Sequence, residues 1–205
     1  MALDTPKNNA GLTDEQLLLL YRGGQTQAFE ALVERYRLEL FHFLIRFVGG
    51  RAAAEDLFQE AFLQVHLSAD TFDTTRRFRP WLFTIAANKA RDHLRRNHRR
   101  QAARLSAPLD KGGEEGRTFA DLIAGDAPVP LEEVEREETR ELVRRVMAQM
   151  PEHLREVLLM AYFHQFAYKQ IAQMLDIPLG TVKSRLHAAV ASFAELWKRK
   201  YEKSA

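Results

Sequence analysis

Hydrophobic residues recur at spacings of three and four along most of the chain, which predicts α-helices on both sides of a central break. In the first half, one such stripe covers Phe29–Leu44, and Gly49–Gly50 ends the helix that carries it. A second stripe covers Leu57–Val65. A third helix is expected over 79–104, with Pro80 in its first turn, where a missing N–H is tolerated.

The start of the chain predicts a short additional helix. Thr13 and Gln16 have the spacing of a capping box, in which each side chain bonds the other residue's backbone N–H. No segment alternates hydrophobic and polar residues over the length of a strand. The first half is therefore predicted to be a compact helical bundle.

The second half is expected to contain four helices, over 131–149, 151–165, 168–176 and 179–199. The last two are separated by the tight turn Ile177–Gly180, so a helix-turn-helix is predicted. Its second helix carries a stripe that we expect to be buried, formed by Val182, Leu186, Val190, Phe193 and Trp197.

Between the two halves, residues 105–131 hold four of the ten glycines and three of the seven prolines, and no helical period survives there. We therefore expect an all-α protein with two small helical domains joined by a flexible acidic linker. The predicted divisions are 1–104, 105–131 and 132–205.

The composition and motifs of the chain exclude several classes of protein. The chain has no Cys, and it lacks both the long apolar run of a membrane span and a basic-then-apolar leader, which favours a cytoplasmic protein. Its seven His have no metal-binding spacing, and there is neither a phosphate-binding glycine loop nor a nucleophile elbow. We therefore expect no enzyme activity, no metal and no cofactor.

Charge is strongly segregated although the net charge is only +2. The segment Arg76–Arg104 holds nine Arg and one Lys against one acid, whereas Asp110–Glu141 holds eleven acids against four bases. Aromatic residues, among them Phe78 and Phe83, lie at the start of the basic helix. Cations beside aromatic rings suit melted nucleic acid, because phosphates pair with the cations and bases stack on the rings. The alternative is that the rings are ordinary core residues and the arginines a solvated surface.

The last predicted helix offers a second site for nucleic acid. Lys183, Ser184, Arg185 and His187 lie off its hydrophobic stripe near the N-terminus, where a recognition helix reads base edges in the major groove. Gly180 allows close approach of the backbone to a phosphate.

Six short segments together resemble the extracytoplasmic-function group of the sigma-70 family. They are AFEALV at 28–33, AEDLFQEAF at 54–62, RPWLFTIAAN at 79–88, MPEHLREVL at 150–158, YKQIA at 168–172 and PLGTVKSRLH at 178–187. The resemblance covers about residues 15–100 and 134–197.

This resemblance implies an initiation subunit of bacterial RNA polymerase that binds the clamp helices of the largest core subunit and promoter DNA. The residues expected to contact the polymerase are Asp56, Gln59 and Glu60. Those expected at the −10 element, where a base flips into the loop 68–78, are Phe72, Asp73, Arg79, Trp81, Asn88, Lys89, Arg91, Asp92, Arg95 and Arg96. Those expected at the −35 element are Arg155, Tyr168, Lys169, Thr181, Lys183, Ser184, Arg185 and His187.

The resemblance also implies an anti-sigma factor as a further partner, and it places the acidic linker in the product channel of the polymerase. We further hypothesise that in the free protein the linker folds back on Arg91–Arg104. One departure concerns Ala188–Ala191, where relatives carry further arginines. The rival interpretation, a stand-alone helix-turn-helix regulator, accounts for 150–199 but gives no role to the basic helix or to 54–62.

Overall fold

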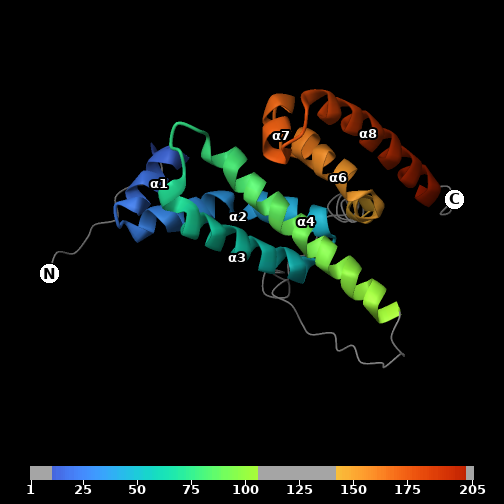
Figure 1. The fold of residues 1–205 in the computed structure, drawn as a ribbon, viewed down its shortest axis with the longest axis horizontal. Helices are drawn as coiled ribbons and strands as arrows, with labels where there is room; N and C mark the ends of the chain where they lie inside the picture. The colour runs from blue at the N-terminus through green and yellow to red at the C-terminus, as the bar shows by residue number, and fades with distance from the viewer. Residues whose placement is uncertain (1–10, 106–141, 202–205) are drawn as a thin grey trace, which may run out of the picture.

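The computed structural model describes residues 11–105 and 142–201, which are helical throughout apart from short turns (Figure 1). The first domain comprises α1 (Asp14–Arg22), α2 (Thr26–Val48), α3 (Arg51–Ser68), the 3₁₀ turn η2 (Ala69–Thr71) and α4 (Phe78–Leu105). The second comprises a helix over 142–149, α6 (Glu152–Leu158), the π turn η4 (Leu159–Phe163), α7 (Tyr168–Leu175) and α8 (Leu179–Tyr201). The prediction of an all-α fold with two helical domains is confirmed.

The helix ends follow the local signals in the sequence. The Thr13 hydroxyl accepts a hydrogen bond from the Gln16 N–H at 3.2 Å, and the Gln16 side chain accepts one from the Thr13 N–H at 2.9 Å, which confirms the predicted capping box. α2 ends at Gly49, whose φ of 82° is the left-handed conformation that glycine adopts without strain. Pro80 lies in the first turn of α4, as expected.

The first domain is built around large apolar side chains from all four of its helices. Leu17 from α1, Phe43 from α2, Leu57 from α3 and Phe83 from α4 are buried to 1% exposure or less. The rings of Phe43 and Phe83 pack edge to face, with centroids 5.1 Å apart. Burial of these side chains is the main force that holds the bundle together.

In the second domain α6 and α7 pack against α8. Val182 and Leu186 are buried as predicted, but the prediction for Val190 is wrong, because its side chain is 45% exposed. Ala189 is buried in its place. At 100° per residue, position 189 returns to the direction of Val182, whereas position 190 lies about 80° away from it.

The two domains pack against each other. α7 lies beside α4, and α6 and η4 contact α2, so that the C-terminal domain covers the middle of α4 (Figure 1). The contact reaches His98, whose ring lies 3.2 Å from the Glu152 carboxylate, and the end of α4 extends beyond it. The predicted acidic linker and its contact with Arg91–Arg104 lie outside the described residues.

Candidate nucleic-acid and polymerase interfaces

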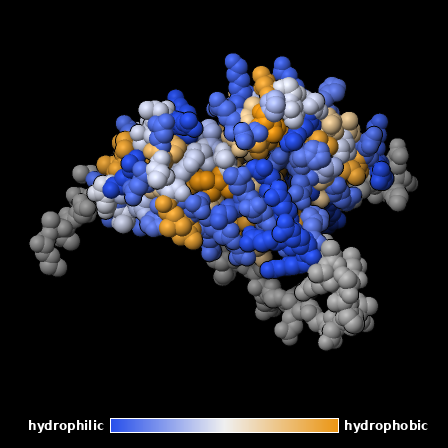
Figure 2. All heavy atoms as spheres, viewed as in Figure 1, coloured by the Kyte–Doolittle hydropathy of each residue, from blue (hydrophilic) through white to orange (hydrophobic). Residues whose placement is uncertain are grey.

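The second half of α4 presents a cationic surface. Its exposed side chains include those of Arg95, Arg96, Arg99 and Arg100, and the space-filling view shows a hydrophilic face there (Figure 2). Asn88 and Asp92 are exposed as well. Four cations on one helix attract phosphates regardless of base sequence.

Lys89 links this surface to the neighbouring helix. Its ammonium lies 3.7 Å from a carboxylate oxygen of Glu60 on α3. Lys89 is predicted to contact DNA and Glu60 to contact the polymerase, so the structure brings two predicted interfaces together at one ion pair.

The aromatic residues before α4 are arranged differently from expectation. Phe72 is only 7% exposed, because the ring of Trp81 lies over it with a centroid separation of 4.4 Å and Phe78 packs against its edge. A ring covered in this way cannot stack on a base in this arrangement. Trp81, which is half-buried, is the ring presented nearer the surface.

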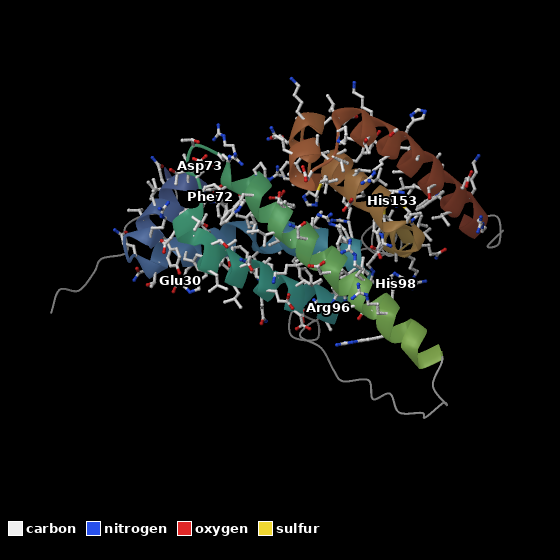
Figure 3. The ribbon with its side chains drawn as sticks, in the orientation of Figure 1. Glu30, Phe72, Asp73, Arg96, His98 and His153 are labelled. Carbon is white, nitrogen blue, oxygen red and sulfur yellow. The ribbon has the colours of Figure 1, made fainter. Side chains whose placement is uncertain are left out.

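Asp73 begins an exposed turn beside Phe72 (Figure 3). Its carboxylate accepts hydrogen bonds from the Thr75 N–H at 3.0 Å and the Thr75 hydroxyl at 2.7 Å. These bonds lower the pKa of Asp73. The turn is therefore ordered by its own side chains before any ligand arrives.

An apolar groove lies between α2 and α3, and Gln59, one of the predicted polymerase-binding residues, is part of its lining. Asp56 and Gln59 are exposed on α3 and Glu60 is partly so. The groove encloses about 490 Å³, and its lining consists of Arg37, Leu38, Phe41, His42, Arg51, Glu55, Phe58 and Gln59. Leu38 at its edge is 62% exposed, which is unusual for so large an apolar side chain beside other apolar residues.

The predicted recognition helix, α8, begins at Leu179 after a left-handed residue, Asp176, ends α7. Lys183, Ser184 and His187 are exposed along its first turns, and Thr181 is partly buried. At the start of α7, Lys169 and Tyr168 are also exposed, the latter by 42%. The structure thus gathers seven of the eight predicted −35 residues, Arg185 included, at the N-terminal ends of α7 and α8.

Arg155 does not join this group. Its side chain is 5% exposed and donates hydrogen bonds to the carbonyl oxygens of Phe47, Ala148 (2.9 Å) and Met150 (2.8 Å). The Phe47 carbonyl belongs to the first domain, at the end of α2, so Arg155 bridges the two domains. Its expected contact with a DNA phosphate is not available in this arrangement.

Glu156, which sequence reasoning missed, also lies between the domains. It is 3% exposed, and its two carboxylate oxygens lie 3.5 Å from Nε of Arg91 on α4 and 3.6 Å from Nη1 of Arg185 on α8. Burial raises the pKa of Glu156, and the two arginines oppose that shift. The Glu156 carboxylate therefore pairs with two arginines that are predicted to bind DNA.

A third polar contact joins α2, α4 and the π turn. Glu39 accepts hydrogen bonds from Arg79 and from the His164 ring (3.2 Å), and Arg79 also donates to the His164 carbonyl at 2.8 Å. Burial disfavours the charge of Glu39, but these hydrogen bonds and the charge of Arg79 outweigh it and lower the pKa to about 2. Arg79, expected at the −10 element, is thus an interdomain residue here.

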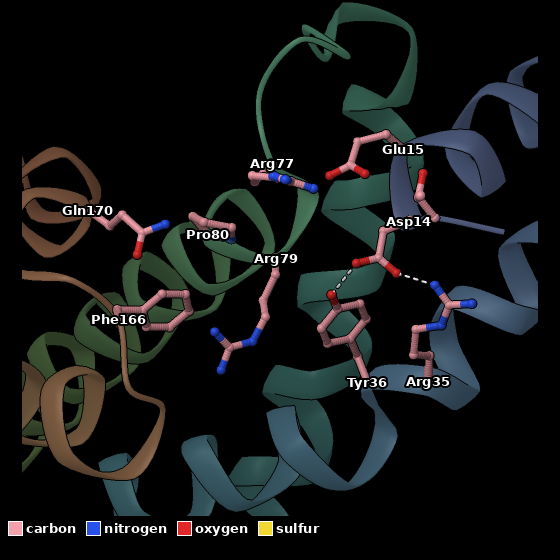
Figure 4. A pocket seen from close by; sticks show the side chains of 10 residues that line it. Asp14, Glu15, Arg35, Tyr36, Arg77, Arg79, Pro80, Phe166 and Gln170 are labelled. Carbon is pink, nitrogen blue, oxygen red and sulfur yellow. Dashed lines mark hydrogen bonds and ion pairs between the residues drawn. The ribbon is translucent and has the colours of Figure 1, made fainter. Parts of the chain in front are cut away.

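Arg79 also lines a cleft between the domains (Figure 4). The guanidinium of Arg79 lies 4.2 Å from the ring centroid of Phe166, a cation–π contact. A signal for Glu39 was present in the sequence, since it is a charged residue next to the apolar stripe of α2. Its partner His164 is 125 residues away, and no local pattern connects the two.

The part of the chain that the structure describes contains no group of three or more His, Asp and Glu residues arranged to hold a metal ion. Within the same residues, no helix is long and apolar enough to cross a membrane.

The fold and these surfaces define a two-domain helical DNA-binding protein with a helix-turn-helix. Two family descriptions match its sequence, Sigma-70 region 2 over residues 32–100 and Sigma-70, region 4 over residues 140–192. The chain belongs to the extracytoplasmic-function sigma factors of the sigma-70 family, as relatives at 30% identity or more show.

Among these relatives, the ECF RNA polymerase sigma factor SigW of Bacillus subtilis is 31% identical over 80% of this chain and 86% of its own length. The RNA polymerase sigma-H factor of Pseudomonas aeruginosa is 32% identical over 86% of this chain and 89% of its own length. Two solved structures share the fold. CnrH in complex with the cytosolic domain of CnrY covers 91% of this chain and 97% of its own at a TM-score of 0.64 and 24% identity. RpoE of Bartonella quintana in complex with the anti-sigma factor NepR covers 83% of this chain and 96% of its own, at a TM-score of 0.62 and 20% identity.

Proposed function

We propose that this sigma factor binds core RNA polymerase through the α2–α3 groove, opens the −10 element with the α4 face and its preceding loop, and reads the −35 element with α8. The observation that carries the proposal is the arrangement of three surfaces of different chemistry on one chain. A protein without enzymatic activity can perform all three tasks, because each requires binding alone.

The groove suits a helical partner. Leu38, Phe41 and Phe58 provide an apolar seat, and Glu55 in its lining and the exposed Asp56 next to it in sequence add negative charge. Glu60 lies toward α4, at its ion pair with Lys89. Apolar contact supplies the affinity of such an interface, and the surrounding charges select the partner. The clamp helices of the largest core subunit are the proposed occupant.

For the −10 element, we assign Asp73 to the captured base and Trp81 to stacking, and Phe72 to supporting Trp81 from below. Asn88, Lys89, Arg91, Asp92, Arg95 and Arg96 line the path of the strands along α4. Extruding a base costs a few kcal/mol, so contacts that exist only with the opened strand drive melting.

For the −35 element, the proposed base contacts come from Lys183, Ser184 and His187, with phosphate contacts from Tyr168, Lys169 and Thr181. Arg185 joins them once Glu156 no longer holds it. An anti-sigma factor is the proposed inhibitory partner, supported by the relative whose fold was solved with one. We place this activity in the cytoplasm, with the polymerase. A stand-alone regulator is not favoured, because it leaves the groove and the α4 face without a role.

Run-off transcription with core polymerase and fragmented genomic DNA of the source organism tests the proposal. We expect discrete transcripts that require this protein, with start sites that define both promoter elements. The double variant Asp56→Arg/Glu60→Arg should abolish them by repelling the polymerase.

Glu30→Arg is the matched control, since Glu30 is an exposed carboxylate of α2 in the same domain, outside the groove (Figure 3). It should transcribe like the unmodified protein. Tight, symmetric binding to duplex DNA without polymerase, combined with no transcripts, would contradict the proposal and favour the stand-alone regulator.

A further inference from the structure

We propose that α1 is a clamp that positions the base-capturing loop, with Arg22 holding the start of the loop and Glu15 holding its end. The inference rests on the proposed function of that loop at the −10 element. It assigns a role in promoter opening to a helix that lies outside the residues matched by Sigma-70 region 2, which begin at residue 32.

Arg22, at the C-terminal end of α1, holds the start of the loop. Its guanidinium donates hydrogen bonds to the carbonyl oxygens of Asp70 (3.0 Å) and Phe72 (3.4 Å), and its Nε lies 3.8 Å from the Asp70 carboxylate. A planar guanidinium can contact two carbonyls at once, which fixes the direction of the backbone between them. This backbone leads directly into Asp73.

Glu15, in the first turn of α1, holds the other end of the loop. One of its carboxylate oxygens accepts a hydrogen bond from the Phe78 N–H at 2.9 Å, which is the first N–H of α4 and has no partner within that helix. Burial opposes the charge of Glu15, yet this bond and others, together with the charge of Arg77, lower its pKa overall. Figure 4 shows Glu15 pointing toward Arg77 at the end of the loop.

The two clamp residues act from one face of one helix. Arg22 follows Glu15 by seven residues, two helical turns, so both side chains project to the same side of α1. The aromatic side chain of Tyr21 fastens the same end of α1 to α3 by its hydroxyl contact with His66. The loop is thus suspended between two fixed points about 10 Å apart along the helix axis, at 1.5 Å per residue.

Between these points the loop is ordered by the Asp73 turn and by Phe72 beneath Trp81. A pocket for a single base requires donors and acceptors placed to within about half an ångström. Small displacements at either end would move Asp73 and Trp81 relative to each other. The clamp therefore governs discrimination at the captured base, and neither clamp residue needs to touch DNA.

The test uses the full chain assembled with core polymerase on a promoter defined by the run-off experiment. The non-template strand carries 2-aminopurine beside the captured base, so its fluorescence reports base extrusion. We expect Arg22→Ala and Glu15→Ala to slow extrusion about tenfold, because each loses charge-assisted hydrogen bonds to the loop. Affinity for core polymerase and for a −35 duplex should stay unchanged.

Discrimination between bases at the captured position separates a positioning role of the clamp from a general loss of stability. Replacing the captured base should impair the unmodified protein about tenfold or more, as a mismatch in a specific site does, but should impair the two Ala variants only about twofold. Glu15→Gln retains an oxygen that can accept the Phe78 N–H bond and should restore most of both properties.

Arg35→Ala is the matched control. Arg35 ties α1 to α2 through Asp14 (2.5 Å) and the Leu12 carbonyl (3.0 Å) and makes no bond to the loop. It should leave extrusion and discrimination intact, although its melting temperature should be equal to or lower than those of Arg22→Ala and Glu15→Ala. Unchanged extrusion in Arg22→Ala and Glu15→Ala, with a transcribing unmodified protein, would overturn the clamp and leave the proposed function standing. Loss of discrimination in Arg35→Ala as well would also overturn it, since any loosening of α1 would then suffice.

Discussion

The interior of the first domain and the seam between the two domains are both buried, but they are built from different chemistry. The interior is apolar, with Leu40, Phe43, Leu44 and Phe47 of α2 fully buried. In the described residues, the buried side chains that carry a charge or an imidazole ring are Arg155, Glu156 and His164, and all three lie at the seam.

This difference separates a permanent contact from a conditional one. Apolar burial is non-directional, and exposing it to water is always unfavourable. A buried ion or hydrogen bond loses much less when the seam opens, because water or another polar partner replaces the lost one. If Arg91 and Arg185 contact the promoter as proposed, its phosphates are such replacements.

The largest expected effect lies in the interior. Leu57→Ala removes a fully buried side chain of α3 and should lower the free energy of unfolding by about 2–5 kcal/mol, through lost burial and the cavity left behind. Urea unfolding followed by far-ultraviolet circular dichroism measures the change. Leu67→Ala on the same helix is the control, since Leu67 is 67% exposed. Its effect should stay within about 0.5 kcal/mol, and equal losses in both would contradict an interior dominated by burial.

A smaller effect is expected at the seam. Arg155→Met leaves the Phe47, Ala148 and Met150 carbonyls without this donor, and it should lower stability by about 1–3 kcal/mol. Because one of these carbonyls belongs to the other domain, the radius of gyration from small-angle X-ray scattering should increase. Lys169→Met, an exposed cation in the same domain, controls for the loss of charge. An unchanged radius would show that Arg155 serves its own domain alone.

The same division explains what could be predicted from sequence. Periodicity located the helices, since the interior follows a local rule, and capping chemistry located Thr13 and Gly49. The error at Val190 arose from extending a stripe by spacings of four where 3.6 residues make a turn, and Phe193 and Trp197 of the same stripe are half-buried. The seam follows no local rule. Arg155 looks like a surface or DNA-contacting residue in sequence, and its burial at the seam depends on contacts with the distant end of α2.

Lys183, Ser184, Arg185 and His187 were reached from their position off the hydrophobic stripe of the last helix, whereas most of the other predicted binding residues were reached by resemblance. Their contacts with DNA and polymerase remain predictions, as do the domain boundaries. Glu15 and Arg22 could not be found in either way. A carboxylate in the first turn and an arginine in the last turn of a helix are ordinary helix-end residues. Their bonds to the loop appear when α1 is placed against it.

Acid should weaken the seam through Glu39. Its pKa is lowered from an ordinary 4.5 to about 2, so its contribution to stability is full above pH 4.5 and is lost as the pH falls toward 2. The stability difference between the unmodified protein and Glu39→Gln should therefore shrink over that interval, measured by urea unfolding at several pH values. Glu34→Gln, on the exposed ion pair with Arg37, should show no such trend. A difference that is constant with pH would contradict the assignment.

The smallest expected effect on stability concerns Glu156, whose replacement should instead change the affinity for DNA. Its pKa is shifted in the opposite direction from that of Glu39, because burial outweighs the two arginines. Glu156→Gln keeps the shape and removes a buried charge, and the side chains of Arg91 and Arg185 are partly exposed, so water can solvate them in its place. Stability should therefore change by no more than about 1 kcal/mol. Arg91 and Arg185 then lose their competing carboxylate.

We therefore expect the polymerase-free variant to bind a mixed-sequence duplex about two- to fivefold more tightly at low salt, with a steeper salt dependence, because more phosphates are neutralised. Fluorescence anisotropy at several salt concentrations measures both quantities. Glu195→Gln, an exposed carboxylate on α8, removes the same charge without releasing either arginine of the Glu156 contact. If both variants gain affinity equally, net charge alone is responsible. If Glu156→Gln gains more, the seam competes with DNA for the same cations, and opening it is coupled to promoter binding.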